Sequence, residues 1–161
     1  GGGTSYIPEG KKFNLYLSPL TFKSTFVLNQ DLANQGAFGV QGAVRDADGN
    51  IISPGKKIYR EMGILVTHKW EFPVAKNVVL DHNLELYTDY LNNFGNIDVN
   101  WQVTASFRVN DFISATLLAH VIYDDDIKFD TVEDDNGVVI DPGVPRIQFR
   151  QQLGIGVNYR F

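Results

Sequence analysis

Apolar and polar residues alternate over long stretches of this chain. Between positions 97 and 109 every odd residue is apolar and every even residue between them is polar. The alternation resumes over 113–123 and again over 153–161. Because successive side chains of a β-strand point to opposite faces, each stretch predicts a strand with one apolar and one polar face.

Weaker alternation and turn residues extend this pattern to the rest of the chain. The prediction is about seven strands and no helix, with each boundary uncertain by about two to four residues. The strand ranges are 12–18, 21–30, 58–72, 77–91, 96–109, 112–126 and 146–161. The short connections, which carry turn residues, are 18–21, 73–77, 92–95 and 110–111, and the long ones are 30–57 and 127–145. The chain 1–161 is therefore expected to form a single all-β region.

The aromatic residues indicate which solvent the apolar face meets. Those assigned to the ends of the apolar rows are Tyr59, Trp70, Phe72, Tyr90, Phe107 and Tyr123. Strands that cross an outer membrane need about 9–11 residues and carry aromatic girdles at both interfaces. We predict a transmembrane antiparallel up-and-down β-barrel. A soluble barrel with its apolar face inward is the alternative.

Composition narrows the choice of partners. The chain has 161 residues, a formal net charge of -5 and no cysteine. The mild acidity argues against a nucleic-acid surface, and the absence of cysteine excludes a disulfide framework. No apolar run has the length of a transmembrane helix, so a bilayer would have to be crossed by strands.

The sequence ends on an apolar row that closes with an aromatic residue. The row consists of Leu153, Ile155, Val157, Tyr159 and Phe161. It resembles the C-terminal insertion signal of outer-membrane barrels, which implies capture by the barrel-assembly machinery. Short turns of such barrels face the periplasm and long loops face outside. We therefore expect a periplasmic C-terminus, outer-membrane lipid around the strands and both long connections outside the cell.

Four stretches carry a further resemblance. SPLTFKSTF, LANQGAFGVQGAV, YTDYLNNFGNIDVNW and HVIYDDDIKF resemble an uncharacterised outer-membrane β-barrel family of Bacteroidota. The resemblance implies the fold and the bacterial outer membrane as location, with no known activity. Members of that family are longer at the N-terminus, and bacterial barrels have even strand numbers. We expect this chain to be the C-terminal portion of a larger barrel.

Catalytic motifs are missing from the sequence, which has no nucleophile elbow, no HExxH and no phosphate-binding loop. We therefore expect neither an enzyme nor a cofactor. His68 and His82 are predicted to face each other on the apolar rows as interfacial residues, and His120 is predicted to line the lumen. Lys69 and Asp81 are predicted to form an ion pair on the polar face.

Several charged stretches receive structural interpretations. Residues 45–50 resemble part of a calcium loop, but the later ligands are missing, so a hairpin tip is favoured there and at 134–137. The glycine-rich stretch 36–42 is too irregular for a phosphate site and is interpreted as a packed loop. The arginines expected to add positive charge to the lumen are Arg108, Arg150 and Arg160.

The expected strand register brings acidic residues together on the polar face. It places Asp89 opposite Asp98 and Asp98 opposite Asp124, with Asp125 and Asp126 just beyond. Like charges opposite each other destabilise a sheet. We hypothesise that one of three partners offsets this repulsion. They are a divalent cation such as calcium, basic side chains from loops or missing strands, or water alone, in which case the pKa values of the carboxyl groups are raised.

Two functions remain open at this point. One is a small pore or transport barrel of unknown substrate, although a barrel of eight strands would fill its interior with side chains. The other is a non-enzymatic accessory or structural subunit that binds another envelope protein.

Overall fold

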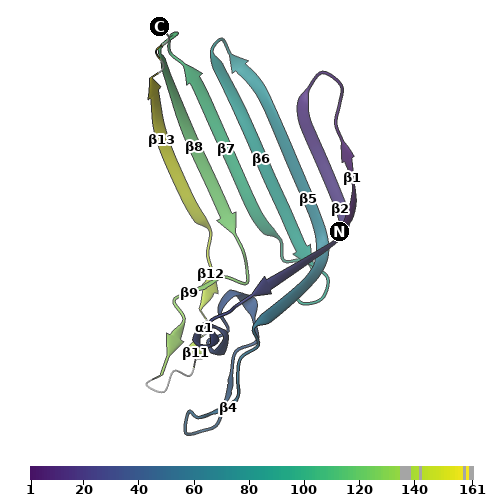
Figure 1. Cartoon of the computed structure of the whole chain (residues 1–161), viewed down its shortest axis with the longest axis vertical. Helices are drawn as coiled ribbons and strands as arrows, with labels where there is room; N and C mark the ends of the chain where they lie inside the picture. The colour runs from purple at the N-terminus through teal and green to yellow at the C-terminus, as the bar shows by residue number, and fades with distance from the viewer. Residues whose placement is uncertain (135–138, 142, 158, 160–161) are drawn as a thin grey trace.

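The computed structural model describes residues 1–134, 139–141, 143–157 and 159 of the chain. Strands make up 62% of the residues and helix 5%, which confirms the predicted all-β class. Figure 1 shows long strands side by side in one curved sheet, with the smaller elements gathered beyond one end of it.

No helix within the described ranges is both long and apolar enough to cross a membrane.

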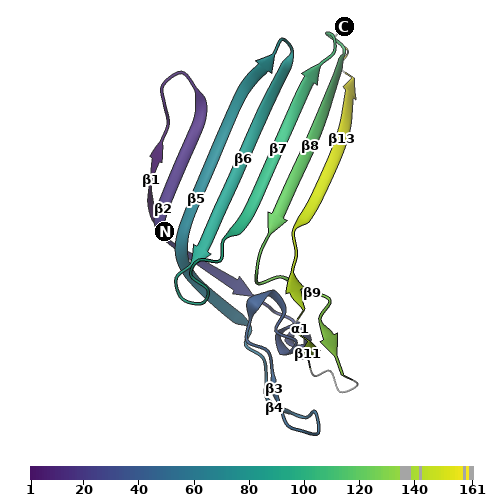
Figure 2. The ribbon, with the colours of Figure 1, turned by 180° about the vertical axis from the view of Figure 1, so that it is seen from behind.

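The main sheet has seven strands in the order β1-β2-β5-β6-β7-β8-β13. Their bounds are β1 Gly2–Tyr6, β2 Lys12–Phe26, β5 Ile58–Ala75, β6 Val78–Asp89, β7 Asp98–Arg108, β8 Ile113–Tyr123 and β13 Gln148–Val157. Every neighbouring pair is antiparallel, which gives the predicted up-and-down topology. β1 and β13 lie at opposite edges in both views and do not pair in the described part of the chain, so the sheet is open (Figures 1 and 2).

The smaller elements belong to the two long connections. They are α1 Gln30–Asn34, η1 Ala37–Gly39, β3 Val44–Arg45, β4 Ile51–Ser53, β9 Lys128–Phe129, β10 Val132–Glu133, β11 Val139–Asp141 and β12 Val144–Pro145. The expectation of no helix is wrong for α1. Asn29 begins this helix, because its side-chain oxygen accepts hydrogen bonds from the backbone amides of Asp31 (2.7 Å) and Leu32 (3.3 Å).

The predicted turn at 18–21 does not exist. β2 is one strand through this segment, and its pairing with β5 shifts between Ser18 and Thr21 as at a β-bulge. Ser18 is completely buried there, and its hydroxyl donates to the carbonyl of Gly2 (2.9 Å) and accepts from Thr21 Oγ1 (2.8 Å). Pro19 is tolerated in a strand because a bulge needs no ladder hydrogen bond from it. Strand β1, which was not predicted, keeps the total at seven.

The connections divide between the two ends of the sheet. Short turns join β1 to β2, β5 to β6 and β7 to β8 at one end, the turn end. Longer connections join β2 to β5, β6 to β7 and β8 to β13 at the opposite end, the loop end (Figure 2). The predicted separation of long and short connections is therefore present, with the turn at 7–11 in place of the one expected at 18–21.

Pairing across the strands separates the polar from the apolar residues. Leu86 pairs with Val99, and Val99 pairs with Tyr123, so these apolar residues form one row across the sheet. Glu85 and Asn100 form the next row, on the other face. The predicted alternation therefore produces one apolar and one polar face, because the side-chain period of two is the same in every strand.

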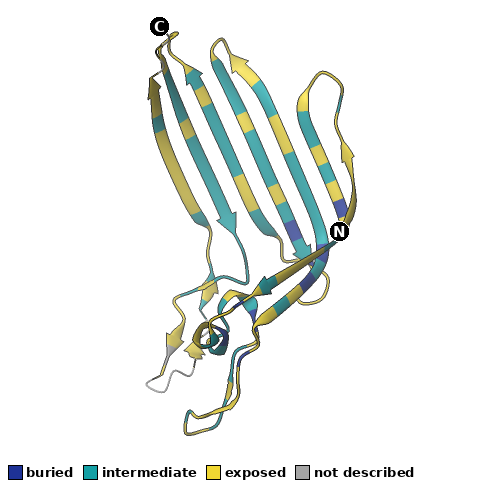
Figure 3. Cartoon of the chain, viewed as in Figure 1, coloured by how far each residue is buried: buried dark blue, intermediate teal, exposed yellow. Residues whose placement is uncertain are grey.

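The sheet encloses almost no core. The buried apolar residues in the described ranges are Val27, Ala33, Val40 and Tyr87. Three of these form a small cluster in the β2–β5 connection. Figure 3 shows the central strands of the main sheet mostly as intermediate residues with scattered exposed ones, and β13 mostly as exposed residues. The exposed fractions on the apolar face of β13 reach 69% for Leu153, 73% for Ile155 and 75% for Val157.

Some aromatic residues of the predicted girdle lie near the strand ends, and others do not. Tyr123 and Tyr90 lie at the loop end, and Phe107 pairs with Val78 beside the turn end. Tyr59 is wrong: it pairs with Thr25 on the polar face and packs against the small buried cluster. Its odd position, two residues before Glu61, carried that information in the sequence.

Trp70 also lies away from the predicted girdle. It pairs with His82, which in turn pairs with Val103 in the middle of β7. Phe72 stays beside it, with the two ring centroids 4.1 Å apart. β5 continues to Ala75, through the predicted connection 73–77, and only two residues separate it from β6, so Trp70 lies farther from the turn end than predicted.

The expected insertion signal has its first residues on β13. Leu153, Ile155 and Val157 face the same side and pair with β8. Tyr159 stacks on Phe112 with 6.3 Å between ring centroids. Phe161 lies outside the described residues.

Candidate functional site

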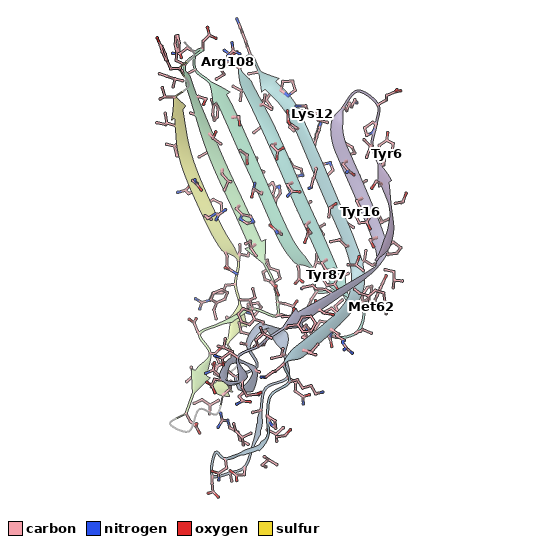
Figure 4. The ribbon with its side chains drawn as sticks, in the orientation of Figure 1. Tyr6, Lys12, Tyr16, Met62, Tyr87 and Arg108 are labelled. Carbon is pink, nitrogen blue, oxygen red and sulfur yellow. The ribbon has the colours of Figure 1, made fainter. Side chains whose placement is uncertain are left out.

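The polar face is hollowed at the loop end. A cavity of about 390 Å³ opens there, and we call it the mouth cavity. Its lining includes Lys23 from β2, Tyr87 from β6 and Asp98 from β7, together with Asp124 just after β8. Tyr87 marks its place near the loop end in Figure 4. The cavity therefore collects charged side chains from strands that are far apart in the sequence.

Three carboxylates lie close together at the loop end, and two of them, Asp98 and Asp124, line the mouth cavity. An oxygen of each of Asp98, Asp124 and Asp125 lies within 4.8 Å of the other two, and all three residues are half-buried. Two unit charges at this separation repel by about 3 kcal/mol at an effective dielectric constant near 20. The predicted neighbourhood of Asp98 and Asp124 is thus present, and Asp125 joins them.

Asp89 does not belong to this group, so its predicted place opposite Asp98 is wrong. β6 and β7 pair with Tyr87 opposite Asp98. The Asp89 carboxylate instead accepts hydrogen bonds from the backbone amides of Met62 (3.2 Å) and Leu91 (2.9 Å), and from the side chain of Asn92. The β6–β7 connection was expected to close as a tight hairpin, but Asp89 folds it as a wider turn held by its own side chain.

The acidic group has amide partners but no cation in the described part of the chain. Asn93 and Asn96 donate side-chain hydrogen bonds to Asp125 at 3.1 and 2.8 Å. Of the ion pairs in that part, none includes Asp98, Asp124 or Asp125. Burial, and next the charges of Asp125 and Asp124, raise the pKa of the neighbouring Asp126 carboxyl above its ordinary value.

Lys23 is the basic residue among those that line the mouth cavity, and Lys128 donates to the backbone carbonyl of Asp125. The Lys23 ammonium bonds Glu61 at 3.1 Å and lies 5.3 Å from the centroid of the Tyr87 ring. Asp98 and Asp124 act on Lys23 through charge alone, at longer range. Lys23 therefore offsets the acidic charge without forming a contact to it.

Two buried polar atoms beside Lys23 have no partner in the described residues. They are Oε2 of Glu61, whose side chain is 2% exposed, and the hydroxyl of Tyr87, a residue that is 7% exposed. The Tyr87 ring lies over Gly63, where a Cβ atom would come within 3.0 Å of the ring and 2.0 Å of the Thr88 carbonyl oxygen. Gly63 thus lets the phenol lie against the sheet. A buried unpaired polar atom costs free energy, so these atoms favour a further polar partner.

The histidine pair lies on the apolar face in a different register from the predicted one. His68 pairs with Leu84 and His82 with Trp70, so the two imidazoles are diagonal neighbours, with ring centroids 4.8 Å apart. Trp101 Nε1 donates a hydrogen bond to His82 Nδ1 at 3.0 Å. This partner was not predicted, although Trp101 lies on the apolar row of the next strand.

The predicted ion pair between Lys69 and Asp81 is also wrong, for the same reason of register. Lys69 pairs with Asn83, and Asp81 lies opposite Glu71, which forms an ion pair with Lys12.

His120 and two of the three arginines predicted for the polar face lie within the described residues. His120 lies on the polar face, where its Nε2 is 2.7 Å from Oδ1 of Asn100. Arg108 bonds Asp111 at 3.1 Å in the turn, and Arg150 pairs with His120 across β8. Arg160 lies outside the described residues.

The aspartate-rich stretch 45–50 forms the predicted hairpin tip between β3 and β4. Asp46 accepts hydrogen bonds from the backbone amides of Asp48 (3.1 Å) and Asn50 (2.7 Å) and from the side chain of Asn50 (3.1 Å). The Asn50 side chain contributes most to lowering the pKa of Asp46. This carboxylate is engaged within its own turn. Of the stretch 134–137, residues 135–137 lie outside the described residues.

The glycine-rich stretch 36–42 is packed against its own connection, as expected. A Cβ atom on Gly42 would lie 3.2 Å from the carbonyl oxygen of Asn34, and that oxygen accepts a hydrogen bond from the amide of Ala43 (2.9 Å). A side chain at this position would force the neighbouring backbone to shift by a few tenths of an ångström.

No protein-family model, no curated protein and no solved structure matches this chain. The resemblance to an outer-membrane family of Bacteroidota therefore stays a prediction. The function has to be argued from the two faces of the sheet and from the mouth cavity.

Proposed function

We propose that this chain is the C-terminal portion of an outer-membrane β-barrel that works as a small pore or transport barrel. The observation that carries the proposal is the apolar face of the main sheet, which covers no core and whose side chains are exposed or half-buried along its length. Soluble monomers rarely expose contiguous apolar patches larger than a few hundred Å². In contact with lipid chains, an exposed apolar face does not carry the free-energy cost that it has in water.

The polar face supports the pore. Residues such as Asn100, Gln102 and Thr104 follow one another along β7 on that face, and water in a lumen would hydrate them. The open edges at β1 and β13 are the places where further strands would complete the wall. Long loops would then lie outside the cell and short turns in the periplasm.

Planar-bilayer recording tests the pore. The full-length barrel would be refolded in detergent, checked for heat-modifiable migration and added to one side of a lipid bilayer. Discrete conductance steps that grow with salt concentration are expected, and the same protein boiled before addition is the control. Correctly folded, inserted protein without conductance steps would contradict the pore.

An accessory or structural subunit is the second candidate. It is favoured by His68 and His82, two imidazoles in the middle of an apolar face. Polar groups on a lipid-facing surface cost free energy, which a hydrogen-bonding envelope protein would recover. Pull-down in a mild detergent tests this function. The unchanged chain should retain a stoichiometric partner, and the His68→Leu/His82→Leu variant should lose it.

A further inference from the structure

We propose that a two-stranded ribbon at the loop end binds the phosphate of an anionic lipid headgroup, with Arg60 as the main cationic contact and Lys57 as the second. The ribbon consists of residues 21–26 of β2 and residues 58–63 of β5, and we call it the loop-end ribbon. The inference rests on the proposed membrane location of the sheet. It does not depend on conductance, because a lipid can bind at this place on a pore or on an accessory subunit.

The loop-end ribbon projects past the neighbouring strands. The pairing of β5 with β6 ends at Gly63 and Asp89, whereas β2 and β5 stay paired as far as Phe26 and Ile58. Figure 1 shows these two strands running on beyond the ends of β6 to β8, and Figure 4 labels Met62 in this part of β5. The ribbon therefore exposes both of its faces where the main sheet has already ended.

One face of the ribbon continues the apolar face of the sheet and carries a cation. Phe22 and Phe26 are 63% and 64% exposed on this face. Ser24 lies between them and pairs with Arg60 across the ribbon. Arg60 is two residues from Met62 in the same strand, so both side chains lie on this face. The cation is thus placed within an exposed apolar strip.

Arg60 has no acidic partner on its own face. None of the ion pairs in the described part of the chain includes it. The adjacent Glu61 points to the opposite face and bonds Lys23 at 3.1 Å. At the end of the ribbon, the exposed Lys57 donates one hydrogen bond to the carbonyl of Leu28 at 3.2 Å, and Leu28 is itself 84% exposed. Both cations can therefore bind an anion from outside the chain.

The position of Arg60 along its strand matches the headgroup layer of a bilayer. The aromatic residue Tyr90 marks the loop end of the apolar face, and its amide donates to the carbonyl of Met62 at 2.8 Å. Arg60 lies two residues beyond Met62, which is about 7 Å at the rise of a strand. The polar layer on each side of the hydrocarbon is about 5–8 Å thick. An arginine at this depth reaches lipid phosphates, whose oxygens suit the two parallel N–H donors of its guanidinium.

Native mass spectrometry of the full-length barrel in detergent tests the site. Dipalmitoyl phosphatidic acid and dipalmitoyl phosphatidylcholine are the probes, because they share their acyl chains and differ in net headgroup charge. The unchanged protein should bind phosphatidic acid at least about fivefold more tightly. An Arg60→Gln/Lys57→Gln variant should lose this preference. The matched control is Lys11→Gln/Lys76→Gln, which removes the same number of charges from exposed lysines at the turn end and should keep it.

A second pair of variants tests the geometry while Arg60 stays in place. Ser24→Glu puts a carboxylate directly opposite Arg60, so that the two can form a cross-strand ion pair. The preference for phosphatidic acid should then fall at least about threefold. Ser24→Gln has nearly the same size without the charge and should leave the preference unchanged.

Folded protein without a preference for phosphatidic acid would overturn the proposal, and so would equal effects of the ribbon variant and its turn-end control. Displacement of the lipid by an equal concentration of inorganic phosphate would overturn it too, since it would indicate a site for the free ion. Flotation with lipid vesicles separates this failure from that of the proposed function. A chain that floats with vesicles but shows no headgroup preference loses only this site, whereas a chain that does not float contradicts the membrane barrel and the site together.

Discussion

Polar side chains on the two faces of the main sheet have different kinds of partner. On the polar face, carboxylates gather at the loop end, where Lys23 bonds Glu61, and Asn93 and Asn96 bond Asp125. On the apolar face, the neutral indole N–H of Trp101 donates a hydrogen bond to His82. The difference agrees with the proposed barrel, in which water screens charges on the polar face and the lipid-facing side satisfies its polar atoms within the protein.

The largest expected effect comes from placing a charge on each face in turn. Val103→Arg or Leu117→Arg on the apolar face should lower the free energy of unfolding in lipid by about 2–4 kcal/mol. Thr104→Arg and Thr116→Arg, one residue away on the polar face, are the matched controls and should have little effect. Urea titration in lipid vesicles, followed by tryptophan fluorescence, measures both. Equal penalties for the two pairs would mean that the faces are assigned wrongly.

A smaller loss of stability is expected when one ion pair is broken at each end of the polar face, and the loss should differ between the two ends. Lys23→Ala at the loop end leaves Glu61, with its 2% exposed side chain, without its cation and should cost about 1–3 kcal/mol. Lys12→Ala near the turn end breaks a pair whose side chains are 73% and 36% exposed, and should cost at most about 1 kcal/mol. Figure 4 labels Lys12 at that end. The same urea titration compares the two variants, and a larger loss in Lys12→Ala would contradict the burial argument.

The smallest effect compares one neutral hydrogen bond on each face. Trp101→Phe removes the donor to His82, and in lipid no water replaces it, so the expected loss is about 1 kcal/mol. Asn100→Ala removes the partner of His120 on the polar face, where water takes its place, and should cost less than about 0.5 kcal/mol. Repeating both measurements in detergent, where water reaches the apolar face more easily, should narrow the difference.

Much of the fold followed from local alternation. The strands β5 to β8 and β13 lie close to their predicted ranges, and the facing of residues such as Leu117 and Thr116 agrees with the pattern. The strand β1 carried no alternation strong enough to find it, because Gly2 and Gly3 have no side chain to form an apolar row. Pro19 was interpreted as a turn residue, whereas it lies in a bulge of β2.

The candidate site could be predicted only in part. Asp98 and Asp124 come together because the short β7–β8 turn leaves little freedom in their register. Asp89 was misplaced because the β6–β7 connection is longer and folds around the Asp89 carboxylate itself. Lys23 and Glu61 come from strands β2 and β5, which a long connection joins, and no sequence spacing reveals their contact.

The sequence by itself determined which face each strand residue takes, since the period of two depends only on the residue's own strand. Only the tertiary structure decided which residues lie opposite one another. Register between strands depends on bulges and connections. The connection between β5 and β6 is two residues long instead of the predicted five, and together with the bulge between Pro73 and Ala75 this places Trp70 rather than His68 opposite His82. The mouth cavity depends on the tertiary structure, because its charged residues come from strands in distant parts of the chain.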